Sequence, residues 1–287
     1  MDTLHVGDVS LTHIPQVEHW ALPAPEFFPG TDPGTWTAHR SRLAPAHWDP
    51  DTGRVRIAVQ SWLLRGSGRT VLVDTGLNPS SLPPDAPAGG DLPAGLAAAG
   101  VTVADVDLVI CTHLHADHVG GNTGLDSHGA WTPTFPHARY LFSRPDLEFF
   151  DPDTLTEQPG RSARVFAESI APVLRAGQAE IWDDAYTVDA GLRLELAPGH
   201  TPGAGVVTVA SGGERALLVG DLLHSPAQFW EPAVSSCFCH DPRQAARTRE
   251  RILAQAADTD ALLVPGHFGG QRAMRVRRDG DRFSPRP

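Results

Sequence analysis

Several apolar runs of strand length in this 287-residue chain end directly before a side chain that can bind a metal ion. The runs are "DLVICT", "LELAPG", "ALLVG" and "ALLVPG", and the residues that follow them are His113, His200, Asp221 and His267. Buried strands read as continuous apolar segments, and strand ends are rigid enough to hold metal ligands in place. The pattern therefore predicts a core of strands whose ends carry a metal site.

The densest group of candidate ligands lies in the segment "THLHADHVGG". His113 and His115 are two residues apart on an extended segment, so they can face one ion. Asp117 and His118 lie at the turn into the next element and can reach the other side. With the three later residues, the candidate ligands number seven, more than the three protein ligands of a typical catalytic zinc site. Seven ligands fit two ions, with Asp221 as the bridge.

Composition favours a soluble globular protein, because 41% of the residues are hydrophobic and 20% are charged. The formal net charge of −11 argues against binding to nucleic acid or to an anionic membrane. All 23 basic residues are arginine, which excludes Schiff-base chemistry on lysine. The three cysteines do not make a disulfide framework. We see no signal peptide and no apolar run of membrane-spanning length, so we expect a cytoplasmic location.

The order of apolar runs predicts strands and helices in both halves of the chain. Residues 55–64 and 70–74 read as a hairpin, and helices are expected at residues 91–100, 161–177 and 241–258. This mixture indicates an α/β fold with two sheets covered by helices. We find no linker, so we expect one domain over residues 1–287.

Residues 1–50 are expected to form an N-terminal strand followed by an irregular, aromatic-rich segment. The aromatic residues of this segment are Trp20, Phe27, Phe28, Trp36 and Trp48. Three interpretations stay open: plain packing onto the core, one wall of a pocket, and an arm that contacts the partner subunit of a homodimer.

The motifs in this order resemble those of the metallo-β-lactamase superfamily. The resemblance rests on His113-x-His115-x-Asp117-His118, on "GHTPG", "GD" and "PGH" around the later ligands, and on the earlier "VDTG". It covers the chain from about residue 55 to 270 and implies an αββα sandwich, with two mixed sheets flanked by helices and metals at one edge.

The resemblance also implies how the ligands are shared between two divalent ions. In the di-metal hydrolases of that family, one ion would be held by His113, His115 and His200. The other would be held by Asp117, His118 and His267, with Asp221 between the two. Zinc is the expected metal, although imidazole and carboxylate ligands also suit Mn, Fe or Co. Two such ions lower the pKa of water enough to make it a nucleophile near neutral pH, and Asp117 can steer that nucleophile or shuttle a proton.

One further histidine distinguishes branches of the family. N-acyl homoserine lactonases share all seven ligands, but many have a tyrosine three residues after the bridging aspartate. This chain has His224 there, and "GDLLHSPAQF" instead resembles methyl parathion hydrolase and related lactonase-like proteins. His224 is expected either to polarise the substrate or donate a proton, or to be only a hydrogen-bonding residue behind the ligands.

These features predict a hydrolase that acts on a small neutral ester or lactone, with phosphotriester cleavage as a side activity. The ligand motifs contain no arginine to clamp an anionic substrate. Phe229, Trp230, Phe27 and Phe28 are expected to offer apolar surface for the substrate. The alternatives are a glyoxalase-II-like thioesterase and, below it, a non-catalytic metal-binding protein.

Overall fold

The computed structural model describes residues 2–66, 68–78, 89–153, 159–280 and 282–286, with only the backbone at residues 159–161. The chain divides into two compact units. Unit 1 comprises residues 1–17 and 59–186, and unit 2 comprises residues 18–58 and 187–287. The expectation of a single domain stays a prediction. No helix in the described part of the chain is long and apolar enough to span a bilayer.

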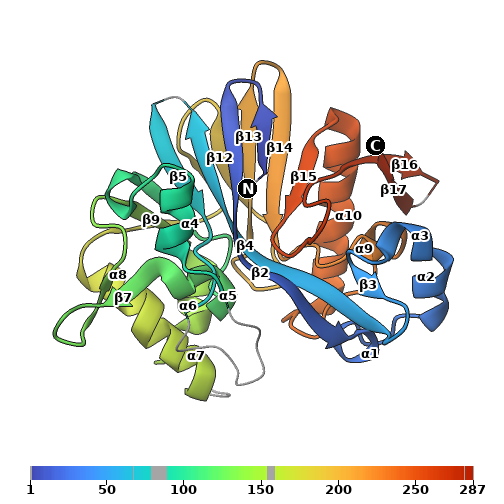
Figure 1. Ribbon diagram of the computed structural model, residues 1–287, viewed down its shortest axis with the longest axis horizontal. Coiled ribbons are helices and arrows are strands. Elements are labelled where there is room, and N and C mark those ends of the chain that lie inside the picture. Colours follow the sequence, from blue (N-terminus) through green and yellow to red (C-terminus); the bar gives the residue numbers. More distant parts are fainter. Residues whose placement is uncertain (1, 67, 79–88, 154–158, 281, 287) are drawn as a thin grey trace. The chain divides into compact units, whose positions relative to one another are not determined.

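Unit 1 is built on a mixed sheet (Figure 1), whose strand order is β1-β2-β4-β5-β6-β9-β10. The strands are β1 (Thr3–Val6), β2 (Val9–Pro23), β4 (Arg54–Gly66), β5 (Arg69–Val73), β6 (Leu108–Ile110), β9 (Arg139–Ser143) and β10 (Ala179–Trp182). β4 and β5 pair antiparallel, which confirms the predicted hairpin, and β5, β6, β9 and β10 run parallel. β2 and β4 continue into unit 2.

Unit 1 also contains short helices. They are α4 (Leu92–Ala98), α5 (Ala116–Val119), α6 (Arg144–Phe150), α7 (Pro159–Val165) and α8 (Ala171–Arg175), with 3₁₀ turns at Val103–Asp105 and Gly120–Asn122 and a ribbon of β7 (Thr123–Leu125) and β8 (Trp131–Pro133). The helix expected at 161–177 is interrupted by a π-type turn at Phe166–Ile170. Pro172 explains this turn, because its ring would clash with the carbonyl four residues earlier.

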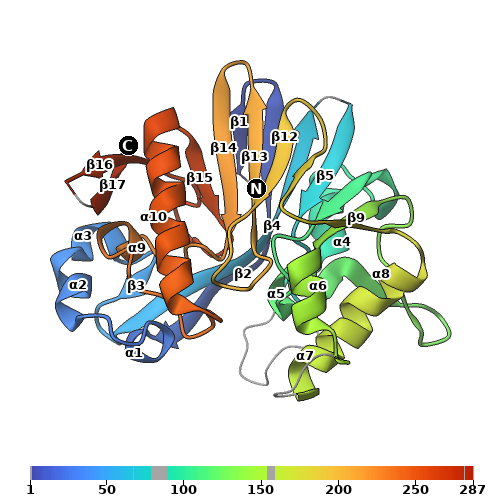
Figure 2. The ribbon, with the colours of Figure 1, turned by 180° about the vertical axis from the view of Figure 1, so that it is seen from behind.

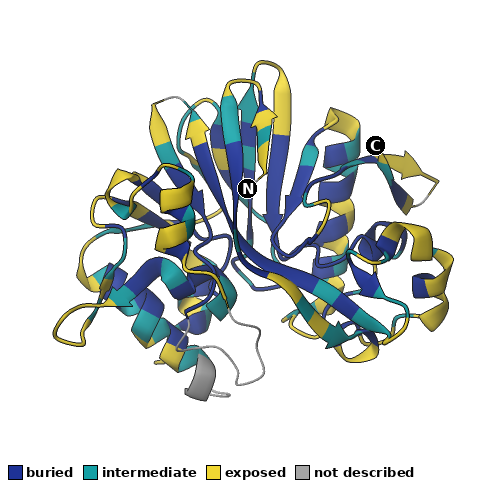
Figure 3. Cartoon of the chain, viewed as in Figure 1, coloured by how far each residue is buried: buried dark blue, intermediate teal, exposed yellow. Residues whose placement is uncertain are grey.

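Unit 2 contains a second sheet, and a long helix covers one of its faces. The strands, in their sheet order, are β11 (Ala185–Thr187), β12 (Leu192–Leu196), β13 (Gly205–Ser211), β14 (Glu214–Gly220) and β15 (Leu262–Pro265). The helix is α10 (Pro242–Thr259), which lies beside β15 in both views (Figure 1 and Figure 2). Ile252 and Leu253 of α10 pack on Leu263 of β15. Figure 3 shows the buried residues of α10 along one face and the exposed ones along the other. A terminal hairpin follows, β16 (Arg275–Asp279) and β17 (Arg282–Arg286).

The segment expected to be irregular contains short helices, namely α1 (Ala24–Phe27), α2 (Pro33–Ala38) and α3 (Arg40–Leu43), followed by the short strand β3 (Trp48–Asp49). α2 starts with a local signal, because the Asp32 side chain accepts a hydrogen bond from Gly34 N at 2.8 Å and Pro33 fills the first helical position. Phe27, Phe28 and Trp36 form a buried cluster with residues of α9 (Ala227–Trp230). These aromatic residues therefore pack within unit 2.

A close backbone approach places the loop of His200 against the start of α10. Gly199 has φ +134°, and a Cβ on it would lie 2.2 Å from the backbone nitrogen of Ala245. Only glycine fits both this dihedral angle and the space beside Ala245.

His47 of unit 2 makes the stability of the fold sensitive to acid. Its ring is buried against Phe268, and burial lowers the pKa of His47 from 6.5 to about 4. The unfolded chain therefore takes up a proton below about pH 6.5 that the folded chain refuses. We expect the free energy of unfolding to fall by about 3 kcal/mol between pH 6.5 and 4 through this residue, with no further loss from it below pH 4.

The measurement is urea unfolding at several pH values for the unmodified protein and for His47→Gln. The variant should lose less stability between pH 6.5 and 4 than the unmodified protein does. The exposed His128 provides the control, because His128→Gln should leave the pH dependence unchanged. Identical pH profiles for the His47 variant and the unmodified protein would show that burial of His47 is not the cause.

Candidate metal centre

The ligands predicted first along the chain gather at the carboxyl end of β6. The chain leaves β6 at Ile110 and reaches His113, whose side chain is buried. His113 Nε2 lies 3.0 Å from His115 Nδ1. Two nitrogens that bind one zinc ion tetrahedrally at 2.0–2.1 Å lie about 3.3 Å apart. The two imidazoles are therefore spaced as ligands of one ion would be.

His118 lies on α5 and is oriented by the carboxylate of Asp74, the residue that directly follows β5. Its Nδ1 lies 2.8 Å from Oδ2 of Asp74, and Asp74 also accepts hydrogen bonds from the backbone and hydroxyl of Thr112 at 2.7 and 2.8 Å. An imidazole that donates its Nδ1 proton to a carboxylate keeps Nε2 as the electron-pair donor that a metal needs. Asp74 itself has φ +57°, a left-handed conformation that aspartate tolerates better than most residues.

Asp117 is more exposed than the neighbouring His118. Its Oδ2 lies 3.8 Å from His118 Nε2, and 27% of its side chain is exposed. His118 is almost completely buried. Asp117 can therefore exchange protons with solvent more readily than His118.

In unit 2, three histidines converge on Asp221, which directly follows β14. The Nε2 atoms of His200 and His224 each lie 3.1 Å from Asp221 Oδ2, and Nε2 of His267 lies 3.0 Å from Oδ1. Asp221, His224 and His267 together have the spacing of a metal-binding group. The predicted ligands of unit 2 are thus brought together around one carboxylate, and His224 stands among them.

The other ring nitrogen distinguishes His224 from the two predicted ligands beside it. His267 Nδ1 lies 2.7 Å from Ala58 O, and His200 Nδ1 lies 3.6 Å from Cys239 Sγ. These contacts fix the ring of each predicted ligand with Nε2 toward Asp221. His224 Nδ1 is buried and has no hydrogen-bond partner among the described residues. His224 therefore has one ring nitrogen to which no described residue hydrogen-bonds.

The pKa values of His200 and His224 also differ. Burial opposes protonation of His200, but the charge and hydrogen bond of Asp221 and the contact with Cys239 outweigh it and raise the pKa of His200 to about 9. Burial dominates at His224 and lowers its pKa to about 4. Asp221 therefore favours positive charge at His200, where an ion is predicted, whereas His224 is neutral at pH 7.

The predicted apolar residues occupy two kinds of position. Phe27 and Phe28 lie in T-shaped arrangements with the His224 ring, with ring centroids 5.4 and 6.4 Å from it. Phe229 is fully buried and packs on Phe268 in the core, and Trp230 stacks on His39 at 3.8 Å. Only Phe27 and Phe28 are thus in contact with a candidate catalytic residue, and the role of all four in substrate binding stays a prediction.

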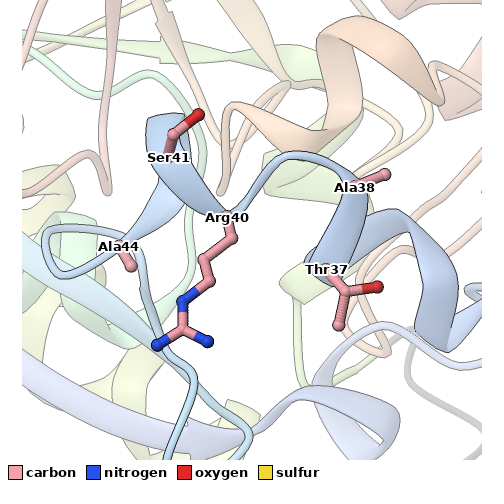
Figure 4. A pocket seen from close by; sticks show the side chains of 5 residues that line it. All are labelled: Thr37, Ala38, Arg40, Ser41 and Ala44. Carbon is pink, nitrogen blue, oxygen red and sulfur yellow. The ribbon is translucent and has the colours of Figure 1, made fainter.

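A surface hollow in unit 2 lies on α2 and α3 (Figure 4). It is lined by Thr37, Ala38, Arg40, Ser41 and Ala44. None of the candidate ligands or catalytic residues lines it. Arg40 is the one charged residue among those that line it, so we assign no reaction to this hollow.

Residues 54–267 match the family model described as the metallo-beta-lactamase superfamily. Metallo-beta-lactamase domain-containing protein 1 of Rattus norvegicus is 29% identical over 238 residues, which are 81% of this chain and 77% of that protein. The N-acyl homoserine lactonase AttM of Agrobacterium fabrum is 26% identical over 182 residues, 59% of this chain and 61% of that protein.

Solved structures similar to this chain include AbOPH, a hydrolase of the beta-lactamase superfamily, with a TM-score of 0.83 at 22% identity over 99% of this chain and 96% of that one. AidC, a dizinc quorum-quenching lactonase in complex with a product, has a TM-score of 0.80 at 22% identity over 100% of this chain and 96% of that one. These similarities show the fold and, with the family model, confirm the predicted metallo-β-lactamase fold class.

The contact between Asp74 and His118 predicts a specific loss in Asp74→Asn. Asparagine also tolerates the left-handed backbone, but its amide sets a donor in place of one carboxylate oxygen that faces His118 and Thr112. We expect metal affinity to fall by about 10- to 100-fold, measured as zinc competition with a chromophoric chelator.

Asp260→Asn is the matched control, because Asp260 is the other described aspartate with positive φ and is exposed. It should leave zinc affinity unchanged. Equal zinc affinity in Asp74→Asn and in the unmodified protein would rule out an orienting role for Asp74.

Proposed function

Because the chain belongs to the metallo-β-lactamase superfamily of metal-dependent hydrolases, we propose that it is a di-metal hydrolase of a small neutral ester or lactone. The observation that carries the proposal is the convergence of His200 and His267 on the buried carboxylate of Asp221. A buried carboxylate is costly unless a positive charge compensates it. A divalent cation bound by the carboxylate and the surrounding imidazole nitrogens would supply that charge. Similarity to named lactonases supports the choice of bond.

The proposed ligands follow the sharing that the family implies. One ion would be held by His113, His115 and His200, the other would be held by Asp117, His118 and His267, and Asp221 would be a ligand of both. Donor chemistry supports this assignment, because imidazole and carboxylate suit zinc and also Mn, Fe or Co. The fixed Nδ1 contacts of His118 and His267 also support it, since metal-binding histidines usually donate their second nitrogen to an oxygen.

Bound divalent ions would lower the pKa of water and polarise the carbonyl oxygen of the substrate. Within this proposal, Asp117 takes the proton from the attacking water and returns it to the leaving alcohol oxygen. The new bond joins the water oxygen to the carbonyl carbon, and the bond from that carbon to the alcohol oxygen breaks. The partial exposure of Asp117 supports this role, because a proton carrier must reach both the site and solvent.

His224 is proposed to contact the substrate through Nδ1. Its Nε2 faces Asp221 at 3.1 Å, which leaves Nδ1 as the nitrogen available to a ligand. Phe27 and Phe28 beside the same ring supply apolar surface next to that contact. A neutral, partly apolar substrate suits this neighbourhood better than an anion does.

The cytoplasmic location and the homodimer stay predictions.

The metal assignment predicts close to two transition-metal ions per chain in the purified protein. His267→Ala should remove one of them, and Asp221→Ala should weaken both, because Asp221 is the shared ligand. Elemental analysis by mass spectrometry measures the content, and His128→Ala, an exposed histidine, should keep both ions. A single tightly held ion that Asp221→Ala leaves in place would contradict the bridging role.

The substrate assignment predicts an order of kcat/KM values. We expect acyl lactones and aryl esters to exceed acyl-glutathione thioesters, phosphorylated substrates and a β-lactam, with weaker cleavage of neutral phosphotriesters. The reason is the absence of arginine from the ligand motifs, since anionic substrates usually need such a clamp. A preference for the thioester would favour the glyoxalase-II-like alternative. Full metal content without turnover of any substrate would indicate a non-catalytic metal-binding protein.

A further inference from the structure

The segment that carries His224 is held by buried polar side chains that the proposed chemistry does not use. This segment, residues 222–235, starts next to Asp221 and contains α9. Gln228, from α9 itself, and Arg249, from α10, each bind the backbone of this segment at more than one point. Both are fully buried.

Gln228 binds the backbone at His224 directly. Its Oε1 accepts hydrogen bonds from the backbone nitrogens of His224 at 2.8 Å and Ser225 at 3.3 Å. Its Nε2 donates to Val234 O at 2.9 Å. Because the acceptor and the donor end of the amide are both engaged, only one orientation of the side chain satisfies these contacts. Gln228 therefore ties the backbone of His224 to the far end of the same segment.

Arg249 binds both ends of the segment, at Val234 and at Leu222. Its guanidinium donates to Leu222 O at 2.8 Å, to Val234 O at 2.8 Å and to Pro232 O. These acceptors are backbone carbonyls, and burial lowers the pKa of Arg249 only to about 10, so it stays charged at neutral pH. A planar, multi-donor group is suited to holding several carbonyls at once. Val234 O is shared by Arg249 and Gln228, which links the two side chains.

We propose that Gln228, braced by Arg249 through Val234, is a positioning residue that sets the location of the His224 ring beside Asp221. The proposal rests on the proposed function for the role of His224. His224 Nδ1 has no described partner, and the ring contacts Asp221 through Nε2 and packs beside Phe27 and His267. The contact with Asp221 is made by the ring itself, whereas the hydrogen bond from the His224 backbone nitrogen to Gln228 fixes the main chain from which the ring extends. Loss of this contact should displace the ring without removing a metal ligand.

The kinetic test is a double-mutant cycle between Gln228→Met and His224→Ala, with the protein loaded with its metals. Methionine has nearly the length of glutamine but cannot make the hydrogen bonds. With His224 present, we expect Gln228→Met to lower kcat on the best lactone or ester by about 10-fold or more, with KM changed less than about 3-fold. In the His224→Ala background the effect of Gln228→Met should disappear, because contacts that act through one residue are non-additive. An equal fall in kcat in both backgrounds would overturn the proposal.

Gln178→Met is the matched control. Gln178 also donates its side-chain amide to backbone carbonyls, those of Phe135 and Ala138, but in unit 1 and away from the candidate ligands. It should lower stability without changing kcat. Gln228→Glu keeps an oxygen for the His224 nitrogen, although it loses the donor to Val234 and adds a carboxylate at a buried position, so we expect it to retain more kcat than Gln228→Met. If Gln228→Glu and Gln228→Met are equally impaired, the contact with His224 is not what matters.

A readout independent of activity separates this inference from the proposed function. In ¹⁵N-histidine-labelled protein, the His224 ring signals are identified by their absence in His224→Ala. We expect these signals to shift in Gln228→Met and to stay in place in Gln178→Met. If no lactone or ester is hydrolysed, or if His224→Ala leaves kcat unchanged, the proposed function fails and the spectra still decide the positioning role. His224 signals that stay unmoved in Gln228→Met would overturn it.

Discussion

The carboxylate of Asp221 is the group on which the arrangement of unit 2 depends. Three imidazole nitrogens lie about 3 Å from it, and they arrive from three separate connections after β12, β14 and β15. β14 and β15 run parallel, and their register shifts between Leu218 and Gly220, just before the aspartate. Parallel strands deliver their carboxyl ends to one edge, so a single carboxylate can meet histidines that are distant in sequence. Other features of unit 2 lie on the connections that carry these histidines. The cluster around Phe27 and Phe28 packs beside His224, Arg249 binds the segment after His224, and Gly199 brings the loop of His200 against α10.

Much of the fold was predictable because buried strands and their ends leave a direct record in sequence. The runs before His113, His200 and His267 are strands as expected, and α10 begins at the Asp-Pro pair. The short helices of residues 24–43 were not predicted, since four to six residues carry too little periodicity and their starts depend on local caps. The interruption before Pro172 was also missed, because an internal proline can bend, widen or end a helix and sequence does not choose among these.

The candidate ligands were readable from spacing, whereas the residues that orient them were not. Asp74 contacts His118 across 44 residues of sequence, and only the "VDTG" motif marked the region. Arg249 looks like a surface residue of an amphipathic helix, since arginine is rarely buried without a partner. Its partners are carbonyls of a distant loop, which no residue pattern reveals. The sequence likewise does not reveal that Phe229 is fully buried and packs on Phe268.

Two demands fall on the same residue at position 74. The backbone there needs a residue that accepts φ +57°, and the site needs a carboxylate at the reach that aspartate gives to Thr112 and His118. Asparagine and glycine meet the first demand and lose the charge, whereas glutamate keeps the charge but adds a methylene and suits the left-handed region less well. No single amino-acid replacement satisfies both demands. A change of substrate in this scaffold would therefore have to leave aspartate at position 74.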